Sequence, residues 1–265
     1  MIAKRGNIKE HHFAHVKETC RPVSQRVKTR NFPSLPLYDN FSIQLPSKEL
    51  EVLKRLWKQY GSVKHPISKD LINLRWVFKK ILELKNGGYY FTDLGKIAVG
   101  ALSLSRFTEI QEPLILAELT KLERSLQVAK AASLSSYSEK LADFKIYQAQ
   151  LKRILLNTLY LIEVQADDLT FHKIGVTSRP IKERLQEINY DMSQHFFKVN
   201  LNLLGEWEHR GNVERYFKYR YQKFNFPIGA LTEYFRFRQI DPIFHDLQKM
   251  PAKVLDEVEQ GILKS

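Results

Sequence analysis

Two short strand-like stretches constrain the fold more than any other feature of this sequence. Residues 159–164 (LYLIEV) and 171–177 (FHKIGVT) are rich in β-branched and aromatic side chains, and the intervening QADDLT supplies turn-forming residues. Strands with this composition and a short connection pair as an antiparallel hairpin. Gly175 is expected to end the second strand at a point where another group approaches the backbone closely.

A basic helix is predicted directly after the hairpin. In residues 178–188 (SRPIKERLQEI), Ser178 is placed to cap the helix, and apolar residues recur on one face. Because alternate residues of a strand share a face, Tyr160 and Lys173 can project from neighbouring strands toward this helix, which presents Arg184. The sequence therefore predicts three hydrogen-bond donors converging on a position where an anion would bind.

The residues that follow complete a small α+β domain. Residues 199–209 predict a third strand, and residues 211–224 predict a second helix with Asn212 as its cap. We expect a three-stranded antiparallel sheet flanked by helices. Cationic and aromatic side chains interleave here, a combination that favours nucleic acid through phosphate contacts and base stacking. They are Arg215, Lys218, Arg220, Lys223, Arg236 and Arg238 with Tyr216, Tyr219, Tyr221 and Phe226.

The order of these motifs resembles the GIY-YIG nuclease superfamily, and most closely its phage-type DNA-binding branch. The resemblance covers residues 158–238. TLY at 158–160 stands in place of the first motif and KIG at 173–175 in place of the second. The helical arginine follows as Arg184 in KERL, and the glutamate as Glu233 in TEYF.

The resemblance implies a DNA endonuclease that uses Mg²⁺ or Mn²⁺. In this superfamily the glutamate holds the metal ion, the arginine stabilises developing negative charge, and a strand tyrosine positions or deprotonates water; these roles fall to Glu233, Arg184 and Tyr160. One carboxylate suits Mg²⁺, which keeps several of its waters. The sequence departs from the superfamily at Thr158, where glycine is usual, and at Lys173, where tyrosine is usual. A lysine can hold the attacking water or neutralise the phosphate.

Other residues of this region are candidates for supporting roles. Glu214 lies where this branch often carries a glutamate, and an ion pair with Arg215, Lys218 or Arg184 is the structural alternative. His172 and His209 are expected to flank the pocket and could assist proton transfer, although exposed histidines at strand ends are commoner. The auxiliary set is Gly175, His172, His209, Glu214, Arg215, Lys218 and Tyr219.

The chain is long enough for at least two domains, since domains most often contain about 100–150 residues. Residues 46–106 predict two helices, the second at 68–84, then a turn at Asn86-Gly87-Gly88, a short strand and a closing helix. This order resembles a winged helix, and a helical bundle for protein contacts fits equally well. In a winged helix, the second helix would face DNA phosphates with Lys69, Arg75, Lys79 and Lys80. Residues 107–157 predict a helical connector, 158–245 the nuclease domain and 246–265 a tail.

Residues 1–45 form a basic, proline-containing segment. His11, His12, His15 and Cys20 offer the ligand chemistry of zinc, but their spacing matches no closed four-ligand pattern, so solvated histidines are the simpler interpretation. The string IAKRGNIKEHHFAHV, residues 2–16, resembles a segment near the start of CoiA-like competence proteins, and this resemblance implies no function.

The charge of the chain favours a polyanionic partner. Lys and Arg total 42 against 29 Asp and Glu, a formal net charge of +13. No apolar stretch approaches the roughly 20 residues that span a bilayer, and no apolar signal core is present, so we expect DNA rather than a membrane. The single cysteine, Cys20, favours a reducing, cytoplasmic location. Two alternatives stay open: a non-catalytic nucleic-acid-binding protein, and a helical adaptor for protein assembly.

Overall fold

The structure, a computed structural model, describes residues 2–4, 12–14 and 32–264. The chain divides into two compact units, residues 1–32 and 33–265. In the first unit, β1 (Ile2–Lys4) and β2 (His12–Ala14) pair as antiparallel strands. Of the four residues considered as possible zinc ligands, three lie outside the described residues: His11, His15 and Cys20.

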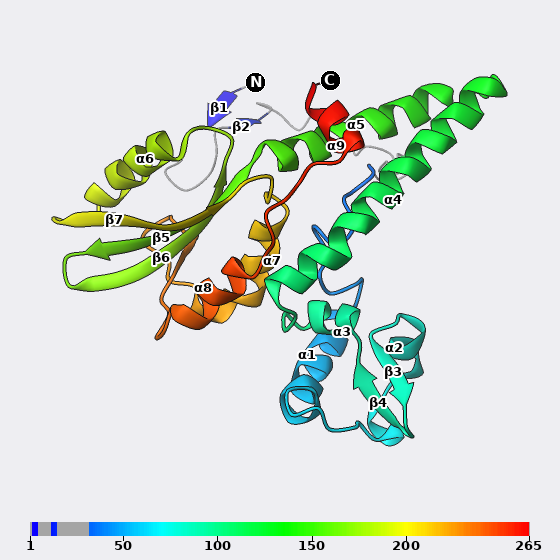
Figure 1. Cartoon of the computed structure of the whole chain (residues 1–265), viewed down its shortest axis with the longest axis horizontal. Helices are drawn as coiled ribbons and strands as arrows, with labels where there is room; N and C mark the ends of the chain where they lie inside the picture. The colour runs from blue at the N-terminus through cyan, green and yellow to red at the C-terminus, as the bar shows by residue number, and fades with distance from the viewer. Residues whose placement is uncertain (1, 5–11, 15–31, 265) are drawn as a thin grey trace. The chain divides into compact units, whose positions relative to one another are not determined.

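The second unit contains an antiparallel sheet in the order β7-β5-β6-β8 (Figure 1). The strands are β5 (Thr158–Ala166), β6 (Leu169–Thr177), β7 (Val199–Trp207) and β8 (Tyr234–Phe235). The predicted hairpin of β5 and β6 is confirmed, and Asp167 takes a positive φ of 49° in its turn. The sheet has one more strand than expected, because the short β8 pairs with the free edge of β6.

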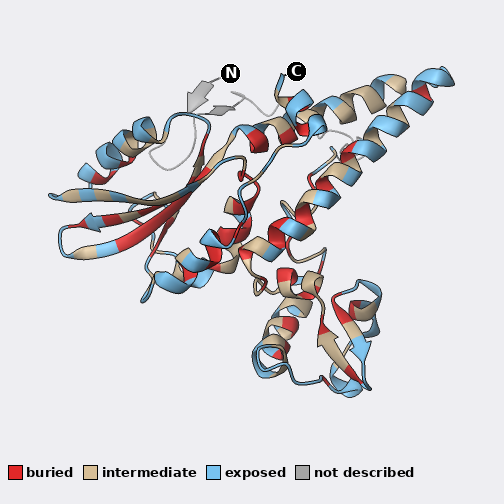
Figure 2. Cartoon of the chain, in the orientation of Figure 1, coloured by how far each residue is buried: buried red, intermediate tan, exposed pale blue. Residues whose placement is uncertain are grey.

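Helices cover both faces of this sheet. They are α6 (Ile181–Ser193), α7 (Val213–Arg220) and α8 (Asp241–Gln248), whereas α9 (Glu257–Lys264) packs on the helical connector. Strand alternation sends Tyr160 and Ile162 to the face covered by α6, and Leu159 and Leu161 to the face covered by α7 and α8. Figure 2 shows buried residues concentrated along β5 and β6, with the outer side of α6 exposed.

Several local predictions for this region were wrong. Ser178 does not cap α6: the N-cap residue is Pro180, and Thr177 Oγ1 accepts a hydrogen bond from Arg179 N at 3.0 Å instead. Gly175 lies inside β6, which continues to Thr177. Asn212 does lie at the N-cap position of α7, but it makes no capping bond; its amide nitrogen donates to Gln111 Oε1 at 2.9 Å. Residues 246–265, the expected C-terminal tail, contain α9, which does not test that boundary.

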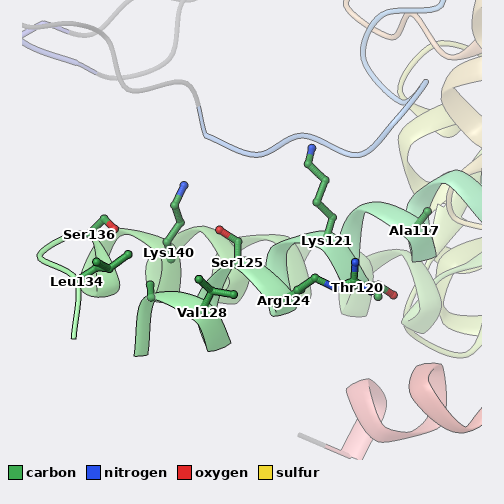
Figure 3. Close-up of a pocket in the computed structure, with 10 residues that line it drawn as sticks. Ala117, Thr120, Lys121, Arg124, Ser125, Val128, Leu134, Ser136 and Lys140 are labelled. Atoms are coloured by element: carbon green, nitrogen blue, oxygen red, sulfur yellow. The ribbon is translucent and has the colours of Figure 1, made fainter. Parts of the chain in front are cut away.

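The predicted connector is a pair of long helices, α4 (Leu104–Ala131) and α5 (Tyr137–Leu156). They pack along a shared apolar cluster, and the Tyr147 hydroxyl donates to Ile115 O at 2.8 Å across the pair. Figure 3 shows a pocket of about 600 Å³ near the turn between them, where Lys121 and Lys140 extend to the same side. None of the helices in the described part of the chain is long and apolar enough to cross a membrane.

The first half of this unit has the order of elements predicted for a winged helix, and that assignment stays a prediction. Its elements are α1 (Ser47–Leu56), a π-helical turn (Trp57–Gly61), a 3₁₀ turn (Lys69–Leu71), α2 (Leu74–Phe78), β3 (Leu82–Lys85), β4 (Gly88–Phe91) and α3 (Asp93–Ala98). Asn86 and Gly87 have φ of 46° and 77° in the β3–β4 turn, as a two-residue hairpin requires. Thr92 caps α3 by accepting from Gly95 N at 3.1 Å.

The helix predicted at 68–84 is wrong. Regular helix ends at Phe78, Lys80 has a positive φ of 56°, and residues 82–85 form β3. Ile81 and Leu82 are fully or almost fully buried in the core of this domain, so their packing overrides the helical spacing that the sequence suggests. The four cations expected on one helix are therefore divided among a 3₁₀ turn, α2 and the residues after it.

Candidate active site

Tyr160 lies in the middle of the α6-facing side of the sheet and is completely buried. Its hydroxyl oxygen accepts a hydrogen bond from Arg184 Nε at 3.2 Å. Gly175 stands directly opposite on β6, and a Cβ atom there would lie 2.4 Å from the Tyr160 hydroxyl oxygen. The glycine of the KIG motif is therefore required because the tyrosine ring occupies the space of a side chain.

Arg184 connects the sheet to α6. While Nε donates to Tyr160, its Nη1 donates to Glu187 Oε2 at 2.7 Å, one turn along the same helix. Partial burial acts to lower the pKa of Arg184, but the bonds to Tyr160 and Glu187 outweigh it and raise the pKa. Glu187 also pairs with the exposed Arg179. Arg184 is thus a permanently charged donor with a fixed orientation.

Lys173 is a buried cation, with 4% of its surface exposed. Its ammonium donates to Glu233 Oε2 at 2.8 Å and lies 4.7 Å from the centre of the Tyr234 ring. Burial lowers the pKa of Lys173, and the bond to Glu233 opposes this effect. Lys173 is therefore charged but releases its proton more readily than an exposed lysine.

Glu233 precedes β8 and receives two ammonium groups. Lys173 donates to one carboxylate oxygen, and Lys218 on α7 donates to the other at 2.7 Å. Burial acts to raise the pKa of Glu233, but the two hydrogen bonds prevail and lower it to about 2. Lys218 also lies 2.9 Å from Glu214 Oε1, one turn earlier on α7. One ammonium group therefore bridges the carboxylates of Glu214 and Glu233.

The four residues predicted to act together do form one cluster. Tyr160 is paired with Arg184, Lys173 is paired with Glu233, and both the Arg184 and Glu233 charges act on the Tyr160 hydroxyl. Burial has the largest effect on Tyr160 and raises its pKa, while Arg184 opposes the shift. Glu214, an auxiliary candidate, also acts on the pKa of Tyr160 and joins the cluster through Lys218.

The two candidate histidines do not flank this cluster. His172 is one residue before Lys173, so strand alternation turns it to the opposite face, where its ring lies 5.6 Å from that of Phe237. Neither of its ring nitrogens has a hydrogen-bond partner among the described residues. His209 Nδ1 donates to Leu155 O at 2.5 Å, at the end of the connector. The expectation that either histidine assists proton transfer at Tyr160 is not supported by this geometry.

Two further auxiliary candidates hold α7 against the first half of the unit. The Tyr219 hydroxyl donates to Ala98 O, and Arg215 forms an ion pair with Asp39 and lies over the Tyr38 ring at 4.5 Å. Helical spacing separates them from Glu214 and Lys218, which share the neighbouring face of α7 and point to the cluster.

Sequence reasoning missed two residues of the site. Tyr234 is 1% exposed and places its ring beside the Lys173 ammonium. Glu187 orients Arg184, and its position three residues after that arginine is the available signal, because residues three apart on a helix are neighbours. No sequence pattern indicated that Tyr234 belongs to the site, since a tyrosine that follows a glutamate is compatible with many structural roles.

The residues present fit a divalent cation that takes few protein ligands. No cluster of three or more histidine, cysteine or acidic side chains suited to a metal ion occurs in the residues that the structure describes. The Lys218 ammonium nevertheless marks a position where one cation contacts both Glu214 and Glu233. Mg²⁺ is often bound by one or two carboxylates together with water. These two glutamates would hold it.

The comparisons with known proteins give a match over the C-terminal part of the chain. No curated protein and no solved structure gives a significant match to the chain. No match supports the resemblance of residues 2–16 to CoiA-like proteins. Residues 157–258 match the model of the T5orf172 domain, a phage domain related to the GIY-YIG superfamily.

Proposed function

We propose that the domain at residues 157–258 is a DNA endonuclease that hydrolyses phosphodiester bonds with Mg²⁺ or Mn²⁺. The observation that carries the proposal is the single cluster formed by Tyr160, Lys173, Arg184 and Glu233 around a partly open carboxylate, whose side chain is 41% exposed. Hydrolysis of a phosphodiester places extra negative charge on the phosphate oxygens, so it requires fixed donors and cations at the reaction centre.

Arg184 is the residue proposed to stabilise this charge. Its guanidinium is held by Tyr160 and Glu187, so it need not reorganise when charge develops, which is the property that makes an electrostatic catalyst effective. The unused nitrogen of the guanidinium is available to a phosphate oxygen. A lysine in its place would keep the charge but could not make the same divergent bonds.

Tyr160 is proposed to position the attacking water. Because burial raises its pKa, the phenol keeps its proton at neutral pH, and it acts as a neutral hydrogen-bonding group. Lys173 stands where the superfamily usually carries its second tyrosine, and its lowered pKa suits a group that holds water or gives up a proton. When bound, the metal ion supplies charge neutralisation at the phosphate and activates water. Glu233, with Glu214, would hold that ion.

Plasmid nicking tests this function. Purified protein with supercoiled plasmid and Mg²⁺ should give nicked circles, and Arg184→Ala and Glu233→Gln should abolish nicking. Lys145→Ala is a matched control, because Lys145 is an exposed cation of α5 outside the cluster. Equal nicking by the wild type, Arg184→Ala and Glu233→Gln would show that this cluster is not the active site.

A non-catalytic phosphate-binding domain is the second candidate. It is favoured by one observation: Glu233 is already neutralised by Lys173 and Lys218. In that case the wild type would bind DNA in a salt-dependent manner, with or without Mg²⁺, and never nick it. Absent or salt-insensitive binding would instead favour the helical adaptor.

A further inference from the structure

A basic groove lies beside the candidate active site. It encloses about 550 Å³ between the C-terminal end of α5 and the loop that joins β6 to α6. Four cationic side chains line it, and no carboxylate does: Lys152 and Arg153 come from α5, Arg179 from the loop and Arg184 from α6. Groups from three separate elements therefore place positive charge at one depression.

This positive charge is only partly compensated. Arg179 and Arg184 share one carboxylate, that of Glu187. Lys152 and Arg153 are in no ion pair with any residue from 32 to 264. Cations in the last turn of a helix are favoured by its dipole, which accounts for Arg153 within α5. The dipole does not account for Arg179, which faces the same groove from another element.

The groove also offers neutral hydrogen-bond donors. Asn157 and Ser178 line it beside the cations, whereas the hydroxyl of Thr177, which also lines it, already donates to Arg179 O at 3.1 Å. Amide and hydroxyl groups together with arginine and lysine are the groups that contact phosphate and sugar oxygens in protein–DNA complexes. Leu156 and Val176 supply the apolar part of the lining, where a sugar can rest.

Arg184 joins the groove to the active site. It lines the groove, and its Nε donates to Tyr160 in the catalytic cluster. A phosphate at Arg184 would thus be one end of a path that continues over Arg179 toward Lys152 and Arg153. A chain of phosphates fits such a path better than a single anion, because the cations are distributed over three elements.

We propose that this groove binds the backbone of the DNA strand next to the phosphate that is cleaved. The connector helix α5 is then part of the substrate interface as well as a link between domains. This inference rests on the proposed nuclease function. It assigns a role in DNA binding to Lys152 and Arg153, which lie outside the motifs of the nuclease domain.

DNA binding by a double variant tests the groove. Fluorescence anisotropy with a short labelled duplex, in EDTA so that no cleavage occurs, compares the wild type with Lys152→Ala/Arg153→Ala. The control is Lys140→Ala/Lys145→Ala, which removes two cations from the N-terminal half of the same helix (Figure 3 shows Lys140). Thermal unfolding confirms that each variant is folded, and Arg153→Gln serves as a milder change.

Loss of two phosphate contacts has a defined signature. Each contact contributes about 0.9 to the slope of log Kd against log salt, so the double variant should lose about 1.8 of slope. The ratio of the Kd of the double variant to that of the wild type should therefore fall by roughly tenfold when the salt concentration rises fourfold. The control should keep the wild-type slope.

The outcomes separate this proposal from the nuclease assignment. An unchanged slope in the double variant, or an equal loss in the control, would overturn the groove even if the wild type nicks plasmid. A reduced slope in the double variant, together with a wild type that never nicks plasmid, would support the groove and remove the catalytic assignment. Competition by inorganic phosphate as strong as that by the same concentration of DNA phosphate would mean that a single anion is bound, and would also overturn the proposal.

Discussion

Replacement of Gly175 by alanine tests the packing that builds the site. The added Cβ would lie 2.4 Å from the Tyr160 hydroxyl oxygen and 2.6 Å from Cζ, far inside contact distance. Tyr160 is completely buried among side chains of β5, β6 and α6, so its ring cannot move aside freely. Overpacking of this kind costs about 1–3 kcal/mol. We therefore expect Gly175→Ala to lower the free energy of unfolding by that amount.

The same substitution should impair activity, because displacement of the ring breaks the bond from Arg184 Nε to the tyrosine hydroxyl. Urea unfolding followed by fluorescence measures the stability, and plasmid nicking measures the activity. Gly261→Ala is the control: a Cβ there meets nothing within 4 Å, and removal of a helix glycine should stabilise the protein by about 0.5–1 kcal/mol. A Gly175→Ala protein as stable and as active as the wild type would refute the packing argument.

Three further predictions concern the charges of the site. Because the pKa of Glu233 is lowered from 4.5 to about 2, its ionised form stabilises the fold above pH 4.5, and this contribution is lost as the pH falls toward 2. Acid unfolding of Glu233→Gln should therefore lack this part of the pH dependence; an identical acid profile would contradict the pairing. Chelation of divalent ions should abolish nicking, and Glu214→Gln should raise the Mg²⁺ concentration for half-maximal rate, whereas an unchanged Mg²⁺ titration would exclude Glu214 as a ligand. His172→Phe should leave nicking unchanged and cost little stability, since a buried imidazole without hydrogen bonds is replaced by an apolar ring; loss of nicking with an intact fold would place His172 in the mechanism.

The local elements of this protein could be predicted from its sequence. The β5–β6 hairpin and the turn at Asn86 and Gly87 depend on contacts between segments that follow each other directly in the chain. Alternation in the two strands places Tyr160 and Lys173 on one face of the sheet, and helical spacing then presents Arg184 to it. For these reasons the candidate cluster could be anticipated once the family resemblance supplied Glu233.

Other features were decided only by the tertiary structure. The two-residue β8 exists because β6 offers a free edge more than 50 positions earlier in the chain, and no two-residue pattern can announce such a pairing. The helix expected at 68–84 does not form over its full length, because Ile81 and Leu82 are buried in the core of the domain instead.

The basic groove is the clearest example of this difference. Sequence patterns identify Lys152 and Arg153 only as exposed positions of a long helix, and Arg179 only as a loop residue. They face a common depression because α5 ends where β5 begins, and the β5–β6 pairing returns the chain to that same edge. Local sequence therefore determines which elements form, whereas long-range pairing and burial determine which side chains meet, because those contacts depend on residues far apart in the chain.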